Sequence, residues 1–452
     1  MTPGPIRDQE ILNALEPLAS ERSLALAVSG GADSTALMLL ARRWQSLLDG
    51  AAPEITVLTV DHGLRAESPR EARQVERLAN EMGLGHATLQ WRGAKPSAGL
   101  QAAARNARYD LLTAHCQENG IGCLVTAHHL DDQAETLLMR LARGSGVDGL
   151  AAIPQSTLWA GVRIRRPLLD FPKSRLIFAL EAAGQPWLED PGNRRQDFER
   201  NRIRKVLDSL ERFGFARGRL ALTARRMRRA QEALDHSTEN FLKQTAKLDR
   251  AGFVTLDGEA FRRAPEEVAL RGLGRTLMAV GGLSAPPRLR KLEAAMAALR
   301  HGDARPRTLA GCRIMVNGAE IRLLREPGRT GLPQLDLEPG ETGLWDRRFR
   351  VAHGGTSGRL RVCALGQAAF ADLRRQSQEV PALPADAGSA LVSFWRDREL
   401  VAVPHLALDL PRRAGHVGCD PALCTAQFVN GALLGSDFAA GLPPDIVANH
   451  AS

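Results

Sequence analysis

Residues 24–34, LALAVSGGADS, decide the fold of this chain. The first five residues are apolar and uncharged, which is typical of a buried parallel strand. The residues that follow, 34–41 (STALMLLA), predict a helix packed on a sheet. Gly30 and Gly31 lie between strand and helix, where positive φ and close approach of a ligand to the backbone are needed. Because the helix begins with free N–H groups at the positive end of its dipole, the turn predicts a phosphate site.

The turn has no lysine at the position that a Walker A loop requires, so it is a different phosphate loop. The pattern Ser-Gly-Gly-x-Asp-Ser resembles the PP-loop of N-type ATP pyrophosphatases, which cleave ATP between the α and β phosphates. This resemblance implies that the phosphates of ATP bind to Ser29, Gly30, Gly31, Ala32, Asp33 and Ser34.

Strand and helix patterns alternate after this turn. Apolar or β-branched stretches at 55–60, 86–91 and 122–126 predict strands, and helices are expected over 69–82, 99–119 and 130–142. The alternation predicts an α/β fold with a doubly wound, mainly parallel sheet. Ligands bind at the carboxyl ends of strands in such sheets. The Gly-Gly turn, Asp61-His62 and Thr126–His128 all follow strands, so we expect them to converge on one crevice.

The rest of the chain predicts further domains. Residues 143–172 are rich in glycine and proline and are expected to be loops, followed by helices over 173–184 and 198–212. A length of 452 residues is typical of two or three domains. We expect a PP-loop domain over 1–212, a mainly helical domain over 213–328 and a small α+β domain over 340–440.

The charge of the chain favours a polyanionic partner. Lys and Arg number 60 against 51 Asp and Glu, a net charge of +9. Residues 200–229 hold eleven basic residues against Asp208 and Glu211, which predicts contact with a nucleic-acid backbone; a solvated basic face is the alternative. The candidate RNA contacts are Arg200, Arg225, Arg226, Arg228 and Arg229.

No membrane partner is expected. No apolar stretch approaches the roughly 20 residues of a membrane span. The first eight residues contain no apolar signal-peptide core, so the sequence predicts a cytoplasmic enzyme.

Carboxylates after the fourth predicted strand form a second candidate site. If a helix begins near His129, Asp132 and Glu135 are separated by three residues and share one face. Beside a phosphate loop, these carboxylates would hold Mg²⁺, which takes oxygen ligands and bridges to substrate phosphates. The alternative is that the acidic residues complement the helix dipole. His128 either orients a phosphate, acts in proton transfer or is a buried structural histidine.

Arg200 and Arg204 are separated by one helical turn in the predicted helix over 198–212. Two arginines side by side repel each other unless an anion lies between them. The pair therefore predicts a phosphate or RNA-backbone contact. A solvated basic face remains the alternative.

Several segments together resemble the tRNA(Ile)-lysidine synthetase family. Besides 29–34, they are 60–65 (VDHGLR), 104–109 (ARNARY), 127–136 (AHHLDDQAET), 143–150 (RGSGVDGL), 166–169 (RPLL), 189–193 (EDPGN) and 200–204 (RNRIR). The resemblance covers residues 24–205, and 345–349 (WDRRF) extends it toward the C-terminus.

The resemblance implies a two-step reaction. ATP adenylates O2 of the wobble cytidine of an isoleucine tRNA with a CAU anticodon, and pyrophosphate leaves. The amine of lysine then attacks C2 and AMP leaves, giving lysidine. The resemblance also suggests a homodimer, and it implies that the domains expected over 213–328 and 340–440 bind tRNA.

The resemblance also implies roles for particular residues. The ATP site would include Val60, His62, Thr126 and His128, with the adenosine near the first two. Mg²⁺ and the charge of the lysine amine would be handled by Asp33, Asp132 and Glu135. The cytidine or its phosphate would be placed by Asn201 and Arg204.

Three other functions fit parts of the sequence. A tRNA-thiolating PP-loop enzyme commonly needs cysteines, but the six cysteines form no Cys-x-x-Cys pair. An ATP-dependent synthetase acting on a small metabolite would have no use for the basic segment 200–229. A non-catalytic tRNA-binding protein would not need the intact set of Asp33, Asp132 and Glu135.

Overall fold

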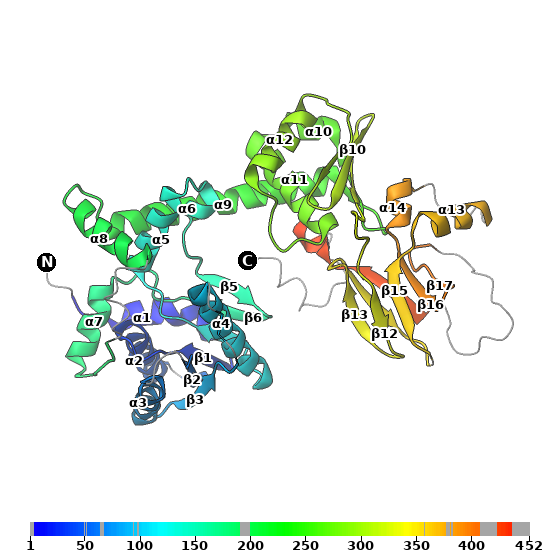
Figure 1. The fold of residues 1–452 in the computed structure, drawn as a ribbon. Coiled ribbons are helices and arrows are strands. Elements are labelled where there is room, and N and C mark those ends of the chain that lie inside the picture. The colour runs from blue at the N-terminus through cyan, green and yellow to red at the C-terminus, as the bar shows by residue number, and fades with distance from the viewer. Residues whose placement is uncertain are drawn as a thin grey trace. The chain divides into compact units, whose positions relative to one another are not determined.

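The computed structural model describes residues 4–435, except 49, 51, 64–66, 94, 97–98, 190–198, 357, 377–379, 381–382 and 407–422. The chain divides into two compact units between Glu232 and Ala233, inside the long helix α9 (Arg217–Thr245). The first unit contains the α/β sheet and the second contains three antiparallel sheets (Figure 1).

The first unit is built on a six-stranded sheet with the order β3-β2-β1-β4-β6-β5. Its strands are β1 (Ser23–Ala27), β2 (Glu54–Asp61), β3 (Gly85–Gln90), β4 (Cys123–Val125), β5 (Ser156–Trp159) and β6 (Val162–Arg165). All neighbours are parallel except β5 and β6. The prediction of a doubly wound, mainly parallel sheet is confirmed. The strand order reverses direction between β1 and β4, which is where such sheets bind ligands.

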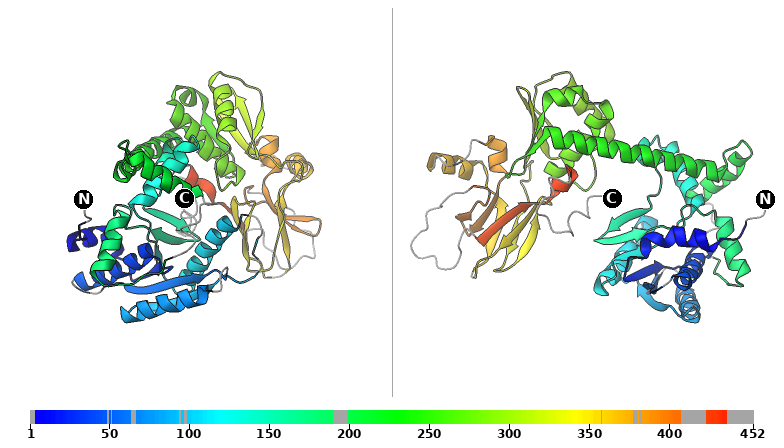
Figure 2. Two further views of the ribbon diagram at one scale, coloured as in Figure 1. Left: turned by 60° about the vertical axis from the view of Figure 1, so that its left-hand side comes forward. Right: turned by 180° about the vertical axis from the view of Figure 1, so that it is seen from behind.

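Helices cover both faces of this sheet (Figure 2). One face packs against α1 (Asp8–Leu15), α2 (Ala32–Leu47), α3 (Ser68–Glu81) and α7 (Lys173–Ala182), and the other packs against α4 (Leu100–Glu118). Strand periodicity explains the division, because successive side chains point to opposite faces. Leu24 and Leu26 lie in the first core, whereas Ala25 lies in the second.

The region expected to be loops contains a β-hairpin. Strands β5 and β6 are joined by Ala160 and Gly161, both at positive φ (47° and 79°). Two-residue turns of this kind match the twist of the strands they join. The alternating pattern on either side of Ala-Gly was the available signal. The hairpin extends the sheet because β6 pairs in parallel with β4.

Three further helices complete the first unit. They are α5 (Leu130–Ala142), the short α6 (Val147–Leu150) and α8 (Glu199–Glu211). Leu137 of α5 and Ala224 of α9 share a small core with Ala152, which fixes the start of α9 on α5.

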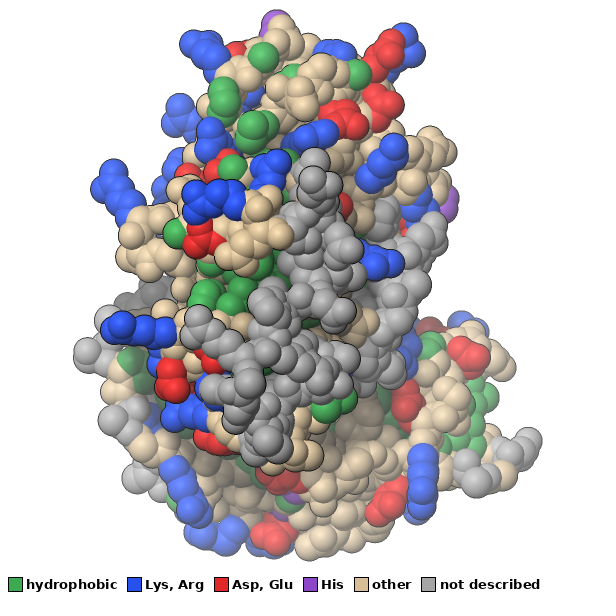
Figure 3. Space-filling model, turned by 90° about the vertical axis from the view of Figure 1, so that its right-hand side faces the viewer, with side chains coloured by type: hydrophobic (Ala, Val, Ile, Leu, Met, Phe, Trp, Pro, Cys, Tyr) green, Lys and Arg blue, Asp and Glu red, His purple; other side chains and the backbone are tan. Residues whose placement is uncertain are grey.

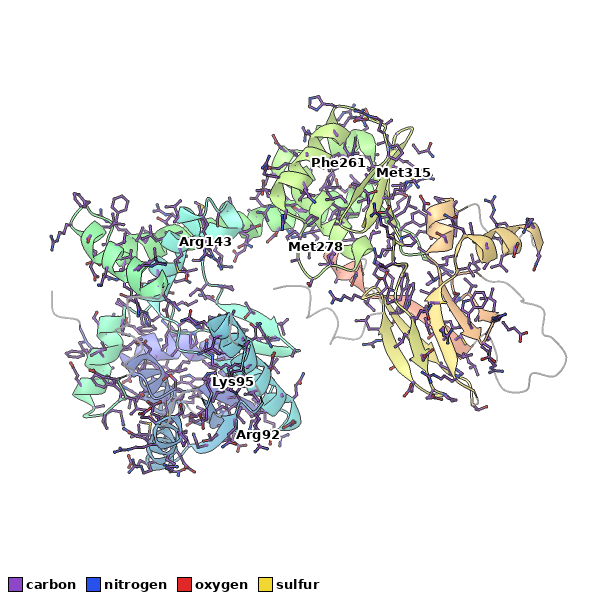
Figure 4. The ribbon with its side chains drawn as sticks, in the orientation of Figure 1. Arg92, Lys95, Arg143, Phe261, Met278 and Met315 are labelled. Carbon is purple, nitrogen blue, oxygen red and sulfur yellow. The ribbon has the colours of Figure 1, made fainter. Side chains whose placement is uncertain are left out.

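The second unit begins with a five-stranded antiparallel sheet, β7-β8-β11-β10-β9. Its strands are β7 (Ala246–Leu248), β8 (Val254–Asp257), β9 (Arg307–Leu309), β10 (Cys312–Asn317) and β11 (Glu320–Arg325). Helices α10 (Gly258–Arg263), α11 (Glu266–Gly281) and α12 (Leu289–Arg300) pack on it, with Phe261 fully buried among them (Figure 4). The strands expected near 305–325 are present, and β7 and β8 add strands to a region expected to be mainly helical.

The remaining strands form two small sheets with a shared core. The four-stranded sheet contains β12 (Leu335–Leu337), β15 (Leu360–Ala364), β16 (Val392–Arg396) and β17 (Glu399–Ala402). The three-stranded sheet contains β13 (Thr342–Trp345), β14 (Phe349–His353) and β18 (Cys424–Phe428). Two short helices, α13 (Gln367–Gln376) and α14 (Ala385–Ser389), pack beside them. Domain limits at 212, 328 and 340 stay predictions. Among the described residues, no helix is long and apolar enough to cross a membrane.

Candidate active site

The loop after β1 has the geometry of a phosphate site. Gly30 has φ of +83°, and a Cβ at this position would lie 2.5 Å from Leu188 Cδ1. Ser34 Oγ accepts a hydrogen bond from the Ser29 N–H (3.2 Å) and donates one to the Gly31 carbonyl (3.0 Å). These two hydrogen bonds fix the conformation of the loop. The first turn of α2 follows the loop directly.

A cavity of about 480 Å³ lies at the carboxyl ends of β1, β2 and β4. The predicted site residues that line it are Ser29, Gly31, Asp33, Ser34, Val60, His62, Thr126, His128, Asp132, Arg200 and Arg204. Gly30, Ala32, Glu135 and Asn201 are not among its lining residues. The convergence expected from the strand ends is therefore present in the fold.

Asp33 is the carboxylate of the phosphate loop. Its Oδ2 accepts a hydrogen bond from Lys173 Nζ (3.0 Å) and lies 3.4 Å from His129 Nε2. Burial raises the pKa of Asp33, but the hydrogen bond from His129 and the charges of His129 and Lys173 outweigh it and lower the pKa to about 2. Asp33 is therefore ionised. Its other oxygen, Oδ1, is buried and accepts no hydrogen bond from any described residue.

His129 is buried next to three carboxylates. Its ring nitrogens lie 3.4–3.6 Å from Asp33, Asp131 and Asp132. Burial lowers the pKa of His129, but the hydrogen bond with Asp33 and the three negative charges outweigh burial and raise it above 6.5. His128 differs, because burial and neighbouring arginines hold its pKa well below 6.5. His129 is thus a partner of carboxylates, and His128 is a neutral imidazole facing the cavity.

Glu135 is the anion that lies between Arg200 and Arg204. Arg200 Nε and Arg204 Nε donate to its two carboxylate oxygens at 2.6 Å and 2.5 Å. Arg200 Nη2 also donates to Asp132 Oδ1 (2.6 Å), and the His129 N–H donates to Asp132 Oδ2 (3.0 Å). The sequence predicted a phosphate between the two arginines. In the structure, the carboxylate of Glu135 occupies this position.

One carboxylate oxygen in the site has no hydrogen-bond partner among the described residues. Both oxygens of Asp132 are engaged, whereas Asp33 Oδ1 is buried without a described donor. The described residues contain no group of three His, Cys, Asp or Glu side chains arranged to hold a metal. A single carboxylate suits Mg²⁺, which keeps several waters and binds substrate phosphates.

His62 lines the cavity near β2. The His62 ring lies edge-on to Trp91 at 5.9 Å, and Lys95 Nζ lies 3.8 Å from the centre of the Trp91 ring. Figure 4 labels Lys95. Burial and the charge of Arg108 lower the pKa of His62. A neutral imidazole beside Val60 suits a planar, uncharged base.

Comparison with known proteins agrees with this geometry. Residues 5–210 match the model of the PP-loop domain. A tRNA(Ile)-lysidine synthase of Bradyrhizobium diazoefficiens is 45% identical over 348 residues, covering 72% of this chain and 96% of the relative. A tRNA(Ile)-lysidine synthase of Ruegeria pomeroyi is 40% identical over 403 residues, covering 88% of this chain and 92% of the relative. This chain belongs to the tRNA(Ile)-lysidine synthase family.

Lys173 is a site residue that the sequence analysis did not predict. Lys173 is the first residue of α7, where the helix dipole disfavours a cation. Its ion pair with Asp33 explains this position. The unfavourable placement of a lysine was the one signal in the sequence.

Three residues of α4 were also not identified as site residues. Arg105, Arg108 and Tyr109 line the cavity, and Tyr109 stacks on Trp159 at 5.0 Å. The segment 104–109 that contains them resembles the family, but its pattern alone predicts no role in the site.

The basic residues of α9 differ in their surroundings. Arg226 and Arg229 are exposed, and Arg225 forms an exposed ion pair with Asp170 (2.6 Å). Arg228 donates to the carbonyl oxygen of Ala151 (2.7 Å), which ties α9 to the end of α6. Arg228 therefore holds the fold together in this structure, whereas Arg226 and Arg229 face solvent.

Proposed function

We propose that this chain ligates lysine to C2 of the wobble cytidine in an isoleucine tRNA with a CAU anticodon. Cytidine O2 attacks the α-phosphorus of ATP and pyrophosphate leaves. The lysine amine then attacks C2, the C2–O2 bond breaks, and AMP leaves with that oxygen while the amine loses a proton. The observation that carries the proposal is the cavity at the reversal of strand order, which joins a phosphate loop to a cluster of carboxylates and arginines.

The loop 29–34 would bind the β and γ phosphates of ATP. Its backbone N–H groups and the hydroxyl of Ser29 are donors, and the dipole of α2 attracts negative charge. The reaction requires no covalent enzyme nucleophile. Positioning and electrostatic stabilisation then supply the rate enhancement.

Asp33 would hold Mg²⁺ through Oδ1, the buried oxygen that accepts no hydrogen bond from a described residue. When bound, the ion would neutralise charge that builds up on the departing pyrophosphate. Lys173 and His129 keep Asp33 ionised, so the carboxylate is ready for a cation.

The arginines would couple RNA binding to lysine binding. Asp132 and Glu135 are held by Arg200 and Arg204, so the lysine amine can reach them only when an arginine turns away. A tRNA phosphate competes for the same guanidinium groups. Asn201, whose Oδ1 lies 3.5 Å from Arg204 Nη1, would help Arg204 place the cytidine or its phosphate. In this proposal, lysine binds productively only after tRNA.

The cysteines do not favour the thiolating alternative. Burial raises the pKa of Cys116 to about 11 and that of Cys123 to about 12. Four of the five described cysteines are buried. Thiols of this kind are poor nucleophiles.

The deciding experiment is lysine incorporation. Labelled lysine, ATP, Mg²⁺ and an isoleucine tRNA transcript with a CAU anticodon are mixed with the purified chain. We expect acid-precipitable label that requires ATP and tRNA and that is lost in Asp33→Ala. Release of pyrophosphate without label would show adenylation with a different second nucleophile. Sedimentation of the same sample tests the predicted homodimer.

A further inference from the structure

The turn between α8 and α9 carries two exposed phenylalanines. Phe213 is 78% exposed and Phe215 is 51% exposed. The other phenylalanines among the described residues are buried or partly buried. Two neighbouring aromatic rings in water, framed by polar residues, indicate an interaction surface.

The backbone of this turn is ordered by its own hydrogen bonds. Gly214, at φ of +85°, donates to the Glu211 carbonyl (3.0 Å), and the Phe215 N–H donates to the Leu210 carbonyl (3.2 Å). This is the Schellman arrangement, in which the residue after the glycine ordinarily packs against the preceding helix. Phe215 occupies that position and remains half exposed. The rings are therefore presented from a defined turn.

The charge around the turn is positive. Its two acidic residues, Asp208 and Glu211, both form ion pairs with Arg217. One face of α9 carries residues separated by three or four positions, all exposed: Arg219, Leu222, Arg226 and Arg229. Aromatic rings next to exposed arginines suit single-stranded nucleic acid, in which bases stack and phosphates need neutralisation.

The turn is connected to the cavity within the first unit. Arg200 and Arg204 of α8 line the cavity, and the helix rise places Glu211 about 10 Å beyond Arg204. Arg217 at the start of α9 reaches Asp131 on α5 (Nε to Oδ1, 3.2 Å). RNA that enters the cavity along α8 would therefore pass close to the aromatic turn.

We propose that Phe213 and Phe215 form a stacking platform for unpaired bases that neighbour the modified cytidine in the anticodon loop. The exposed arginines of α9 neutralise the adjacent phosphates. Unpaired loop bases are the part of an RNA that aromatic side chains can reach. The identity of the RNA rests on the proposed function.

The test is binding of a fluorescently labelled anticodon stem–loop to the full chain, measured by anisotropy and compared with a blunt duplex of the same stem. We expect Phe213→Ala with Phe215→Ala to weaken stem–loop binding about tenfold, with duplex binding unchanged. The matched control is Leu289→Ala in the second unit, an apolar residue that is 59% exposed, between Phe215 and Phe213. Unchanged stem–loop binding in the double variant would overturn the proposal.

A tryptophan variant gives an independent signature. Phe213→Trp retains binding, and the stem–loop, but not the duplex, quenches its fluorescence if a base stacks on the ring. Absence of quenching would refute stacking.

The alternative occupant is a second copy of this chain. A dimer that the double alanine variant dissociates, with stem–loop binding unchanged, would assign the turn to self-association.

The two proposals fail separately. Stem–loop binding requires neither lysine nor ATP, so a chain that forms no lysidine can still support the stacking platform. Lysidine formation with an unchanged KM for tRNA in the double alanine variant would refute the platform alone.

Discussion

Glu135 is a buried carboxylate, 2% exposed, with both oxygens bound by arginines. We predict that Glu135→Gln lowers kcat/KM for lysidine formation about 100-fold, because Arg200 and Arg204 lose the charge that orders them. Stability should fall by about 1–3 kcal/mol, the range for a lost buried charged hydrogen bond. Lysine incorporation and urea unfolding measure the two effects. Asp170→Asn, which breaks an exposed pair, is the control, and an active Glu135→Gln enzyme would contradict the prediction.

His129 makes stability depend on pH. The pKa of His129 is raised above 6.5 in the folded chain, so its contribution to stability is fully present below pH 6.5. That contribution is lost as pH rises through the folded pKa. We predict that Asp33→Asn lowers the pKa of His129, because the charge and hydrogen bond that raise it are weakened. NMR titration of the imidazole carbon signals reports this, with His128, already neutral at pH 6.5, as the internal reference. An unshifted His129 titration would show that Asp33 is not its main partner.

The loop that we propose binds phosphate depends on one of its two glycines more than on the other. At Gly30, φ is +83° and an added Cβ would lie 2.5 Å from Leu188 and 3.0 Å from Val75. At Gly31, φ is −69° and the nearest atom would be 3.9 Å away. We predict that Gly30→Ala costs about 1–3 kcal/mol and abolishes pyrophosphate release, because strain reshapes the loop. The free energy of unfolding of Gly31→Ala should lie within about 0.5 kcal/mol of the wild-type value. Equal unfolding midpoints for both variants would refute this account.

Helix α9 separates arginines that stabilise the fold from arginines available to RNA. We predict that Arg226→Ala with Arg229→Ala weakens tRNA binding and reduces the slope of log K against log salt by about one per phosphate contact. Arg228→Ala should lower the unfolding temperature, because the carbonyl groups of Ala151 and Ala152 lose their donor. Salt titrations of tRNA binding and thermal melts distinguish these effects. A salt slope that Arg228→Ala alone reduces would reverse the assignment.

At the scale of the whole molecule, the chain has two units with separate cores. Lysine, arginine and acidic side chains are interspersed over the described surface of the face in Figure 3. We predict two calorimetric transitions, and we expect a non-hydrolysable ATP analogue to raise the temperature of only one, because the cavity proposed to bind ATP lies within the first unit. At a hundred times Kd, the gain is about 2.7 kcal/mol. A single transition, or an equal shift of both, would show that the units unfold together.

The sequence by itself determined the sheet and the phosphate loop. Strand and helix periodicities are local, so residues 24–142 predicted β1 to β4 and α3 to α5 to within two residues, and for α2 they predicted the start but not the end at Leu47. The Gly-Gly turn follows from backbone freedom at two neighbouring residues, and strand ends in a doubly wound sheet meet at one edge. The positions of Asp33, His62 and His128 around one cavity follow from these rules.

Only the tertiary structure decided which charged side chains form ion pairs. Lys173 reaches Asp33 across 140 residues, and Arg200 and Arg204 meet Glu135 across more than 60. No local pattern contains these pairs, because the partner of a long side chain depends on which segments pack together. The predicted anion between the arginines was sought in a ligand, but the fold places Glu135 there. Phenylalanine is usually a core residue, so the sequence does not indicate that Phe213 is exposed. Only the packing of α8 and α9 leaves this side chain in solvent.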